Sequence, residues 1–336
     1  MAESSSSNPV VWITGANGLI GNYLVQTAPQ CAPRWRVRAL TRADFDLLDF
    51  AAVERAFTQD KPQLIIHCAA ITVVSDAQKN PELARRVNVG ITKFLAELAG
   101  EIPSKSFAER KTQFSRSAEH PLGVLANQAV RAEPVLGAPN LPPPSFVFFS
   151  TDLVFDGRKG NYSETDTTNP LHVYGETKLA AEEIVLKNPR HLVLRTSINA
   201  GTSLSGNRAF NEQLRRSMQS AGAAMTLFTD EFRCPIPAEA TARTVWELVE
   251  KNCSGLYHVA GAEKLSRLQI GELLIQHWPE ITAQIKSGSA KDFPGPPRAL
   301  DTSLDISKVQ KVLSAPLPKF SEWLERLPSP LGEEKD

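Results

Sequence analysis

Two residues that could move a proton, Tyr174 and Lys178, stand four positions apart in the segment YGETK. In a helix, positions i and i+4 lie on one face, about one turn apart. A phenol with a pKa of about 10 is a weak acid at neutral pH. A neighbouring ammonium, helped by a cationic nicotinamide ring, stabilises the phenolate and lowers that pKa. Ser150 and Thr151 supply hydroxyl groups that could hold a substrate oxygen. This combination predicts proton transfer at a carbonyl oxygen while a nicotinamide cofactor exchanges hydride.

A second candidate site is the glycine-rich segment GANGLIG at residues 15–21, directly after the apolar run VVWIT. A phosphate reaches the N–H groups at a helix start only where no Cβ intrudes. The first glycine allows a tight turn, the second lets the pyrophosphate approach, and the third lets helix and strand pack closely. Between a strand and a helix, this spacing predicts dinucleotide binding by Gly15, Asn17, Gly18, Leu19, Ile20 and Gly21.

The residues after the second predicted strand bear on the choice of cofactor. NAD sites place a carboxylate there for the ribose hydroxyls, whereas NADP sites offer a cation to the 2′-phosphate. This chain has Arg42 at that position and no acidic residue before Asp44. We therefore expect NADP(H) to be favoured over NAD(H), and the alternative is that Arg42 is simply solvated.

Apolar runs alternate with segments of helical periodicity along the first 200 residues. We expect strands at 10–14, 36–41, 64–70, 146–151 and 192–195, and helices that begin at residue 19, cover 51–57, begin at Pro81 and cover 173–186. Such alternation requires right-handed crossovers and a parallel sheet covered on both faces. The predicted fold class is α/β, a Rossmann-type doubly wound parallel sheet with a smaller mixed C-terminal substrate lobe.

The predicted domain organisation has three parts. Residues 1–9 form a disordered N-terminus, 10–200 the NAD(P)-binding domain, and 201–330 a substrate-binding lobe with some elements interleaved with the first domain. The polar, proline-rich stretch 101–145 predicts a mobile insertion, with a lid or partner-binding loop as the alternative. In the lobe we expect a strand at 255–259 and helices at 210–220, 238–250, 266–278, 305–313 and 318–327, the third of them capped by Ser266.

The composition of the chain bears on which partners, metals and compartments we expect for the protein. Lys plus Arg and Asp plus Glu both number 37, so the formal net charge is zero and neither nucleic acid nor an anionic membrane is predicted as a partner. The four cysteines lack CxxC spacing and the six histidines lack HxxxH pairing, so we expect free thiols and no metal site. No signal peptide and no run of about 20 apolar residues is present, which predicts a soluble, cytoplasmic protein.

These features together match a known pattern. The chain resembles the extended short-chain dehydrogenase/reductases over nearly its whole length. Within them it is most similar to the dTDP-4-dehydrorhamnose reductase family and to a close relative of that family, the regulatory β subunit of methionine adenosyltransferase. The resemblance rests on TGANGLIG at 14–21, DLLD at 46–49, HCAA at 67–70, VN at 87–88, STDLVFDG at 150–157, ETD at 164–166, PLHVYGETK at 170–178, RTS at 195–197 and RCPI at 233–236.

The resemblance implies roles for further residues. Leu48 and Asp49 would approach the adenine, Ala69 and Ala70 would line the cofactor, and Asn88 would support the cofactor site from the helix behind it. Thr151 would join Tyr174 and Lys178 in catalysis. The residues expected near the substrate are Thr72, Asp152, Arg233 and Arg298.

Three features depart from the pattern of this family or its relatives, and the third bears on the activity. Cys68 stands where asparagine is frequent, and the insertion at 101–145 is not typical. Leu153 follows the Thr-Asp pair, so the acid pair of the related sugar-nucleotide dehydratases is absent and dehydration is not expected.

The resemblance therefore implies an NADPH-dependent reductase of a 4-keto nucleotide sugar, with dTDP-4-dehydro-L-rhamnose as the first candidate. Two alternatives stay open. One is an NADP-binding regulatory subunit that docks on a partner enzyme, and the other is a reductase of a different carbonyl compound. A homodimer is also compatible with this sequence.

Overall fold

The computed structural model describes residues 8–100, 145–220, 225–278, 281, 284–295 and 297–327. The predicted disordered N-terminus and the predicted insertion at 101–145 therefore lie almost entirely outside the described residues. No helix in the described ranges is both long and apolar enough to cross a lipid bilayer.

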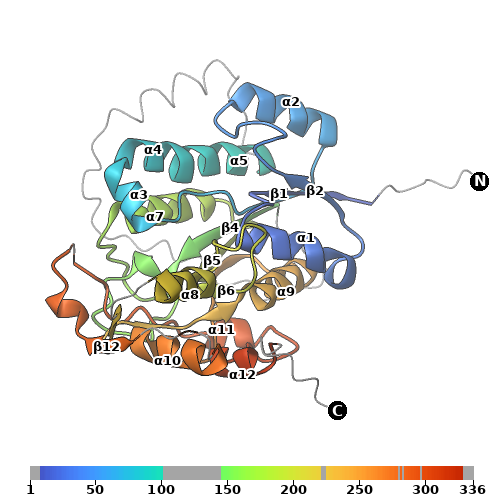
Figure 1. Cartoon of the computed structure of the whole chain (residues 1–336). Coiled ribbons are helices and arrows are strands. Elements are labelled where there is room, and N and C mark those ends of the chain that lie inside the picture. The colour runs from blue at the N-terminus through green and yellow to red at the C-terminus, as the bar shows by residue number, and fades with distance from the viewer. Residues whose placement is uncertain are drawn as a thin grey trace, which may run out of the picture.

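Six parallel strands form the central sheet, in the order β10-β5-β4-β3-β1-β2 (Figure 1). The strands are β1 (Val10–Thr14), β2 (Arg36–Leu40), β3 (Leu64–His67), β4 (Phe146–Thr151), β5 (Leu192–Thr196) and β10 (Gly255–Val259). Every neighbouring pair runs parallel. The strand order reverses between β1 and β3, and in open α/β sheets ligands bind at the carboxyl ends of the strands beside such a reversal.

Alternating side chains of β1 explain why both faces of the sheet are covered. Val11 and Ile13 belong to one apolar core, with residues of α1 (Leu19–Cys31) and α9 (Ala238–Glu250). Val10 and Trp12 belong to a second core on the other face, with residues of α5 (Thr92–Ala99) and α7 (Val173–Val185). Figure 1 shows these two helical layers on opposite sides of the sheet. The predicted doubly wound fold is confirmed.

The remaining chain builds a smaller mixed lobe around a third apolar core that includes Met218, Leu227, Ile270 and Phe320. Three two-stranded pairs belong to it or connect it to the main sheet: β7 with β12, β8 with β11, and β6 with β9. Their bounds are β6 (Asn199–Ala200), β7 (Met225–Phe228), β8 (Phe232–Arg233), β9 (Ile236–Pro237), β11 (Leu265–Ser266) and β12 (Ile285–Gly288). The helices of this lobe are α8 (Phe210–Ser220), α10 (Arg267–His277) and α12 (Phe320–Glu325), whereas α11 (Ser307–Gln310) packs against β10 of the main sheet.

Several element boundaries differ from the prediction. The helix expected from Pro81 is α4 (Pro81–Arg85), then a π-helix, η1 (Arg86–Ile91), and then α5. Strand β3 ends at His67 rather than at residue 70. The helix expected at 305–313 shortens to α11, while α2 (Phe50–Asp60) is longer than predicted and α3 (Val74–Lys79) was not predicted. The predicted cap of α10 is present, because Ser266 and Gln269 form a reciprocal capping box.

Candidate active site

The turn after β1 leaves no room for a Cβ at its first and third glycine positions. Gly15 has a φ of +67°, and a Cβ there would lie 2.8 Å from the Ala69 nitrogen beyond the end of β3. A Cβ on Gly21 would lie 2.4 Å from the Gly15 carbonyl oxygen. The Gly18 N–H donates to that same oxygen at 2.8 Å, which closes the turn. Glycine is therefore required at the first and third positions for this turn to pack against the end of β3.

This turn fits a dinucleotide. Gly18 is the N-cap of α1, no side chain caps the helix, and its first turn carries no acidic residue. The backbone N–H groups at this helix start, including those of Leu19 and Ile20, are thus suited to an anion such as a pyrophosphate. Asn17 is exposed in the turn.

The turn after β2 contains one exposed cation, Arg42, and one carboxylate, Asp44, which is hydrogen-bonded within the turn. The Asp44 carboxylate accepts hydrogen bonds from the Thr41 N–H at 2.9 Å and the Thr41 hydroxyl at 3.0 Å, and it lies 3.3 Å from Arg38. The backbone hydrogen bond from Thr41 lowers the pKa of Asp44 below its ordinary value, so this carboxylate stays ionised. Further along, Asp49 caps α2 by accepting from the Ala52 N–H at 3.0 Å.

Helix α7 carries Tyr174 and Lys178 into the protein interior, where they are 8% and 4% exposed. Gly175 makes this placement possible, because a Cβ there would lie 2.4 Å from the carbonyl oxygen of Leu153. Leu153 belongs to the short helix η2 (Asp152–Val154) that follows Thr151 at the end of β4. The close approach of α7 to η2 places Tyr174 near enough to the Thr151 hydroxyl for this hydroxyl to affect the pKa of the phenol. The sequence-based prediction overlooked Gly175, although it stands inside the YGETK motif.

Burial governs the charges of this pair. Burial raises the pKa of the Tyr174 phenol above its ordinary value, while the Thr151 hydroxyl opposes this rise and the charge of Asp152 adds to it. Burial lowers the pKa of the Lys178 ammonium to about 7, against the influence of Glu182 and Cys68. The lowering of the tyrosine pKa predicted from the sequence included the charge of a nicotinamide ring. In the protein alone desolvation dominates and the pKa is raised. Tyr174 is a neutral phenol here, which is the form that donates a proton.

Asn88, in the π-helix η1, holds the loop after β3 against α7. Its Oδ1 accepts from the Ile71 N–H at 2.8 Å, and its Nδ2 donates to the Ile71 carbonyl at 3.1 Å and to the Thr177 hydroxyl at 3.0 Å. The Thr177 hydroxyl donates in turn to the carbonyl of Tyr174 at 2.8 Å. Both amide protons of Asn88 are used by the protein, so this residue positions the loop that contains Ala69 and Ala70. Thr72 is exposed in the same loop.

Asp152 is buried and linked to both parts of the molecule. Its carboxylate accepts from the hydroxyls of Thr151 at 3.1 Å, Ser197 at 2.9 Å and Thr302 at 3.0 Å. Arg233 lies 3.8 Å away. With so many protein partners, Asp152 orients Thr151 and connects β4 to the C-terminal lobe.

Arg233 and Arg298 meet at a residue that was not predicted, the fully buried Glu231. Its carboxylate lies 3.2 Å from Arg233, 2.9 Å from Arg267 and 2.5 Å from Arg298. Burial favours protonation, but Arg267 and Arg298 outweigh it and hold the pKa of Glu231 at about 2. The only sequence signal was an acid two positions before Arg233, and that signal does not identify the other two arginines.

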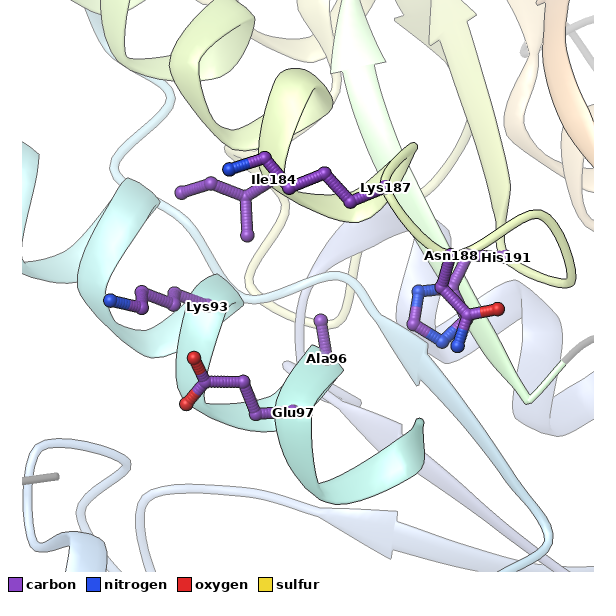
Figure 2. Close-up of a pocket in the computed structure, with 7 residues that line it drawn as sticks. All are labelled: Lys93, Ala96, Glu97, Ile184, Lys187, Asn188 and His191. Atoms are coloured by element: carbon purple, nitrogen blue, oxygen red, sulfur yellow. The ribbon is translucent and has the colours of Figure 1, made fainter. Parts of the chain in front are cut away.

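A separate cavity of about 300 Å³ lies between α5 and α7 (Figure 2). It is lined by Lys93, Ala96, Glu97, Ile184, Lys187, Asn188 and His191. His191 directly precedes β5, so this cavity is at the amino end of that strand, away from the carboxyl edge of the sheet, where Thr151 is the last residue of β4. None of the predicted site residues lines it.

Comparison with known proteins gives two family matches. The model of the NAD dependent epimerase/dehydratase family matches residues 11–230, and the RmlD substrate binding domain matches residues 143–331. A dTDP-4-dehydrorhamnose reductase of Sinorhizobium fredii is 28% identical, covering 94% of this chain and 95% of the relative. Methionine adenosyltransferase 2 subunit beta of Xenopus laevis is 26% identical, covering 89% and 81%. The crystal structure of dTDP-4-dehydrorhamnose reductase from Bacillus anthracis in complex with NADP has the same fold, with a TM-score of 0.74, 21% identity, and coverage of 95% and 98%.

Proposed function

The chain belongs to the extended short-chain dehydrogenase/reductases, within the NAD dependent epimerase/dehydratase family, and from that premise we propose that it is an NADPH-dependent reductase of a 4-keto nucleotide sugar. The proposed substrate is dTDP-4-dehydro-L-rhamnose. The reductase of Sinorhizobium fredii, similar along nearly its whole length, supports this choice. The observation that carries the proposal is the burial of Tyr174 against Thr151 and one turn from Lys178, on a helix packed directly behind β4.

In this mechanism the protein's own side chains donate the proton to the substrate oxygen. NADPH, when bound, would supply a hydride for the ketone carbon. Thr151 orients the substrate carbonyl, and Tyr174 donates its phenolic proton to the carbonyl oxygen as negative charge develops there. Burial keeps Tyr174 protonated until that moment. Lys178 then stabilises the phenolate, and both side chains would face the nicotinamide ribose.

Cofactor binding would use the glycine turn and the cation after β2. Gly15, Gly18 and Gly21 would admit the pyrophosphate to the start of α1. Arg42 would pair with the 2′-phosphate, and the engagement of Asp44 with Thr41 and Arg38 supports NADPH over NADH. We expect Arg42→Ala to weaken NADPH binding by roughly tenfold, as expected for the loss of about 1.4 kcal/mol, and to leave NADH binding unchanged. Clear preference for NADH, together with unchanged NADPH affinity in the variant, would contradict this assignment.

The direct test is NADPH oxidation against a panel of nucleotide-linked keto sugars. Tyr174→Phe should lower turnover by about 10²–10⁴-fold, the usual contribution of a general acid, while NADPH affinity stays within about twofold. The matched control is Tyr257→Phe, which alters a buried tyrosine on β10 in the core between the sheet and α9. Unimpaired turnover in Tyr174→Phe would refute the mechanism.

A second candidate function is regulatory, and the similarity to methionine adenosyltransferase 2 subunit beta favours it. In that case the chain would bind NADP and dock on a partner enzyme. Absence of NADPH consumption across the whole panel, together with stoichiometric capture of a partner, would establish this function in place of the reductase.

A further inference from the structure

The helix face that carries Tyr174 and Lys178 continues to a third polar residue, Glu182. It lies one turn beyond Lys178 and is only 1% exposed. A carboxylate at such depth must be paired, because an isolated buried charge is strongly unfavourable.

The partner is Arg195 of β5, and the geometry between them is that of a fork. Arg195 Nε lies 3.0 Å and 3.2 Å from the two carboxylate oxygens of Glu182, and one terminal nitrogen, Nη2, lies 2.7 Å from Oε2. The guanidinium also stacks 5.0 Å from the Phe155 ring centroid and lies 3.5 Å from Nε2 of His258. The Glu182 carboxylate is therefore fixed in position.

Lys178 is held differently. Its Nζ lies 4.0 Å from the centroid of the Phe148 ring. Burial lowers the pKa of Lys178 to about 7, and of the groups that oppose this lowering Glu182 has the largest effect.

The other titratable groups near Lys178 are neutral at working pH. From the end of β3, burial holds the pKa of His67 at about 3 and raises the pKa of the Cys68 thiol above its ordinary value. On its own helix, the pKa of Tyr174 is raised as well. Beyond Arg195, on β10, burial lowers the pKa of His258 to about 3. Glu182, paired with Arg195, is thus the ionised carboxylate one helical turn from Lys178.

We propose that Glu182 is a positioning residue for the reaction, whose buried carboxylate keeps Lys178 in the charged form, and that Arg195 fixes Glu182 and moderates its effect. The link to catalysis rests on the proposed reductase function. The electrostatic coupling itself does not, so it can be measured on the protein alone.

The first experiment measures the titration of Lys178 by NMR in protein labelled with ¹³C at the lysine ε carbons. The Lys178 signal is assigned by its loss in Lys178→Met. We expect Glu182→Gln to lower the Lys178 pKa by about one unit or more, since an opposite charge nearby shifts a pKa by about 1–3 units. The control, Glu183→Gln, removes an exposed carboxylate from the same helix and should leave the titration unchanged.

A double variant distinguishes the effect of the Glu182 charge on Lys178 from damage to the fold caused by an unpaired Arg195. Glu182→Gln leaves Arg195 buried and unpaired, whereas the combination with Arg195→Met removes both charges together. We expect the Lys178 pKa of the double variant to lie between those of the wild type and Glu182→Gln. It still lacks the carboxylate that opposes the lowering of the Lys178 pKa, but it also lacks the unpaired positive charge that Glu182→Gln leaves in the interior. A wild-type Lys178 titration in either Glu182→Gln or the double variant would overturn the proposal.

The second experiment is the pH profile of kcat/KM. Glu182→Gln should move the alkaline loss of activity to lower pH with little change in KM, and Glu182→Asp should restore much of the profile. If the wild type proves inactive with every keto sugar, the proposed function fails while the NMR result still decides the coupling. If the wild type is active and the profile of Glu182→Gln does not move, the positioning role is refuted.

Discussion

Replacing Lys178 by methionine should make the protein more stable while it removes activity. The ordinary lysine pKa of 10.5 falls to about 7 in the folded protein because the ammonium is desolvated. Above about pH 10.5 the amine is neutral in both the folded and the unfolded chain. As the pH falls, the unfolded chain takes up the proton first, so the folded state loses stability until about pH 7, and below that the loss is constant.

The size of the effect follows from these two pKa values. The interval between them corresponds to about 5 kcal/mol, at about 1.4 kcal/mol per pH unit. Methionine cannot make the contact between the ammonium and the Phe148 ring. The loss of this contact reduces the gain in stability by roughly 1–2 kcal/mol. We therefore expect Lys178→Met to raise the free energy of unfolding by about 3–4 kcal/mol at pH 7, and by little or nothing near pH 10.

The assay is urea unfolding of the two proteins without cofactor at intervals from pH 6 to pH 10. Lys187→Met, at an exposed position just after α7, is the control and should change stability by less than about 0.5 kcal/mol at every pH. A stability difference between Lys178→Met and the wild type that does not vary across this range would show that Lys178 is not desolvated as described.

Three further predictions concern the residues around the site. Gly21→Ala should weaken NADPH binding at least about tenfold in a fluorescence titration, because the new Cβ would meet the Gly15 carbonyl oxygen at 2.4 Å; unchanged affinity would contradict the tight turn. Asn88→Ala should cost about 1–3 kcal/mol in urea unfolding, since it strands the Ile71 backbone groups, and should lower kcat; wild-type stability would show that these bonds are dispensable. Glu231→Gln should destabilise the protein by about 3–5 kcal/mol above pH 5. Because the pKa of Glu231 is held at about 2, the wild type should lose this advantage only as the pH falls from about 4.5 toward 2, which acid titration followed by circular dichroism can test.

The sequence was informative where the signal is local. The glycine turn and the pair Tyr174 and Lys178 depend on spacings of a few residues, and a strand or helix fixes such spacings directly. The central strands were predicted for the same reason, since each is a short apolar run. The parallel sheet with helices on both faces followed from their alternation.

What the sequence could not supply depends on contacts between distant segments. The rise of the Tyr174 pKa in the protein without cofactor was not predicted, because the i+4 spacing shows the ammonium but not the depth of burial. Glu231 was missed, because the three arginines around it come from three places in the chain. The interruption of the helix after Pro81 by η1 was also missed. The supporting position of Asn88 was expected from the resemblance, but its hydrogen bonds to Ile71 could not be predicted.

The origin of the last strand of the main sheet has a consequence for how the chain can fold. Strand β10 pairs with the fully buried β5, yet β6, α8, β7, β8, β9 and α9 lie between them along the sequence. Helix α9 from the same late segment packs on α1, and the Trp246 indole N–H donates to the Leu24 carbonyl at 3.1 Å. A fragment that ends near residue 200 would expose the unpaired edge of β5 and the apolar side of α1. Such surfaces promote aggregation. We therefore expect that residues 10–200 do not form a stable domain on their own, and that β10 can complete the sheet only after the chain has been synthesised past residue 259.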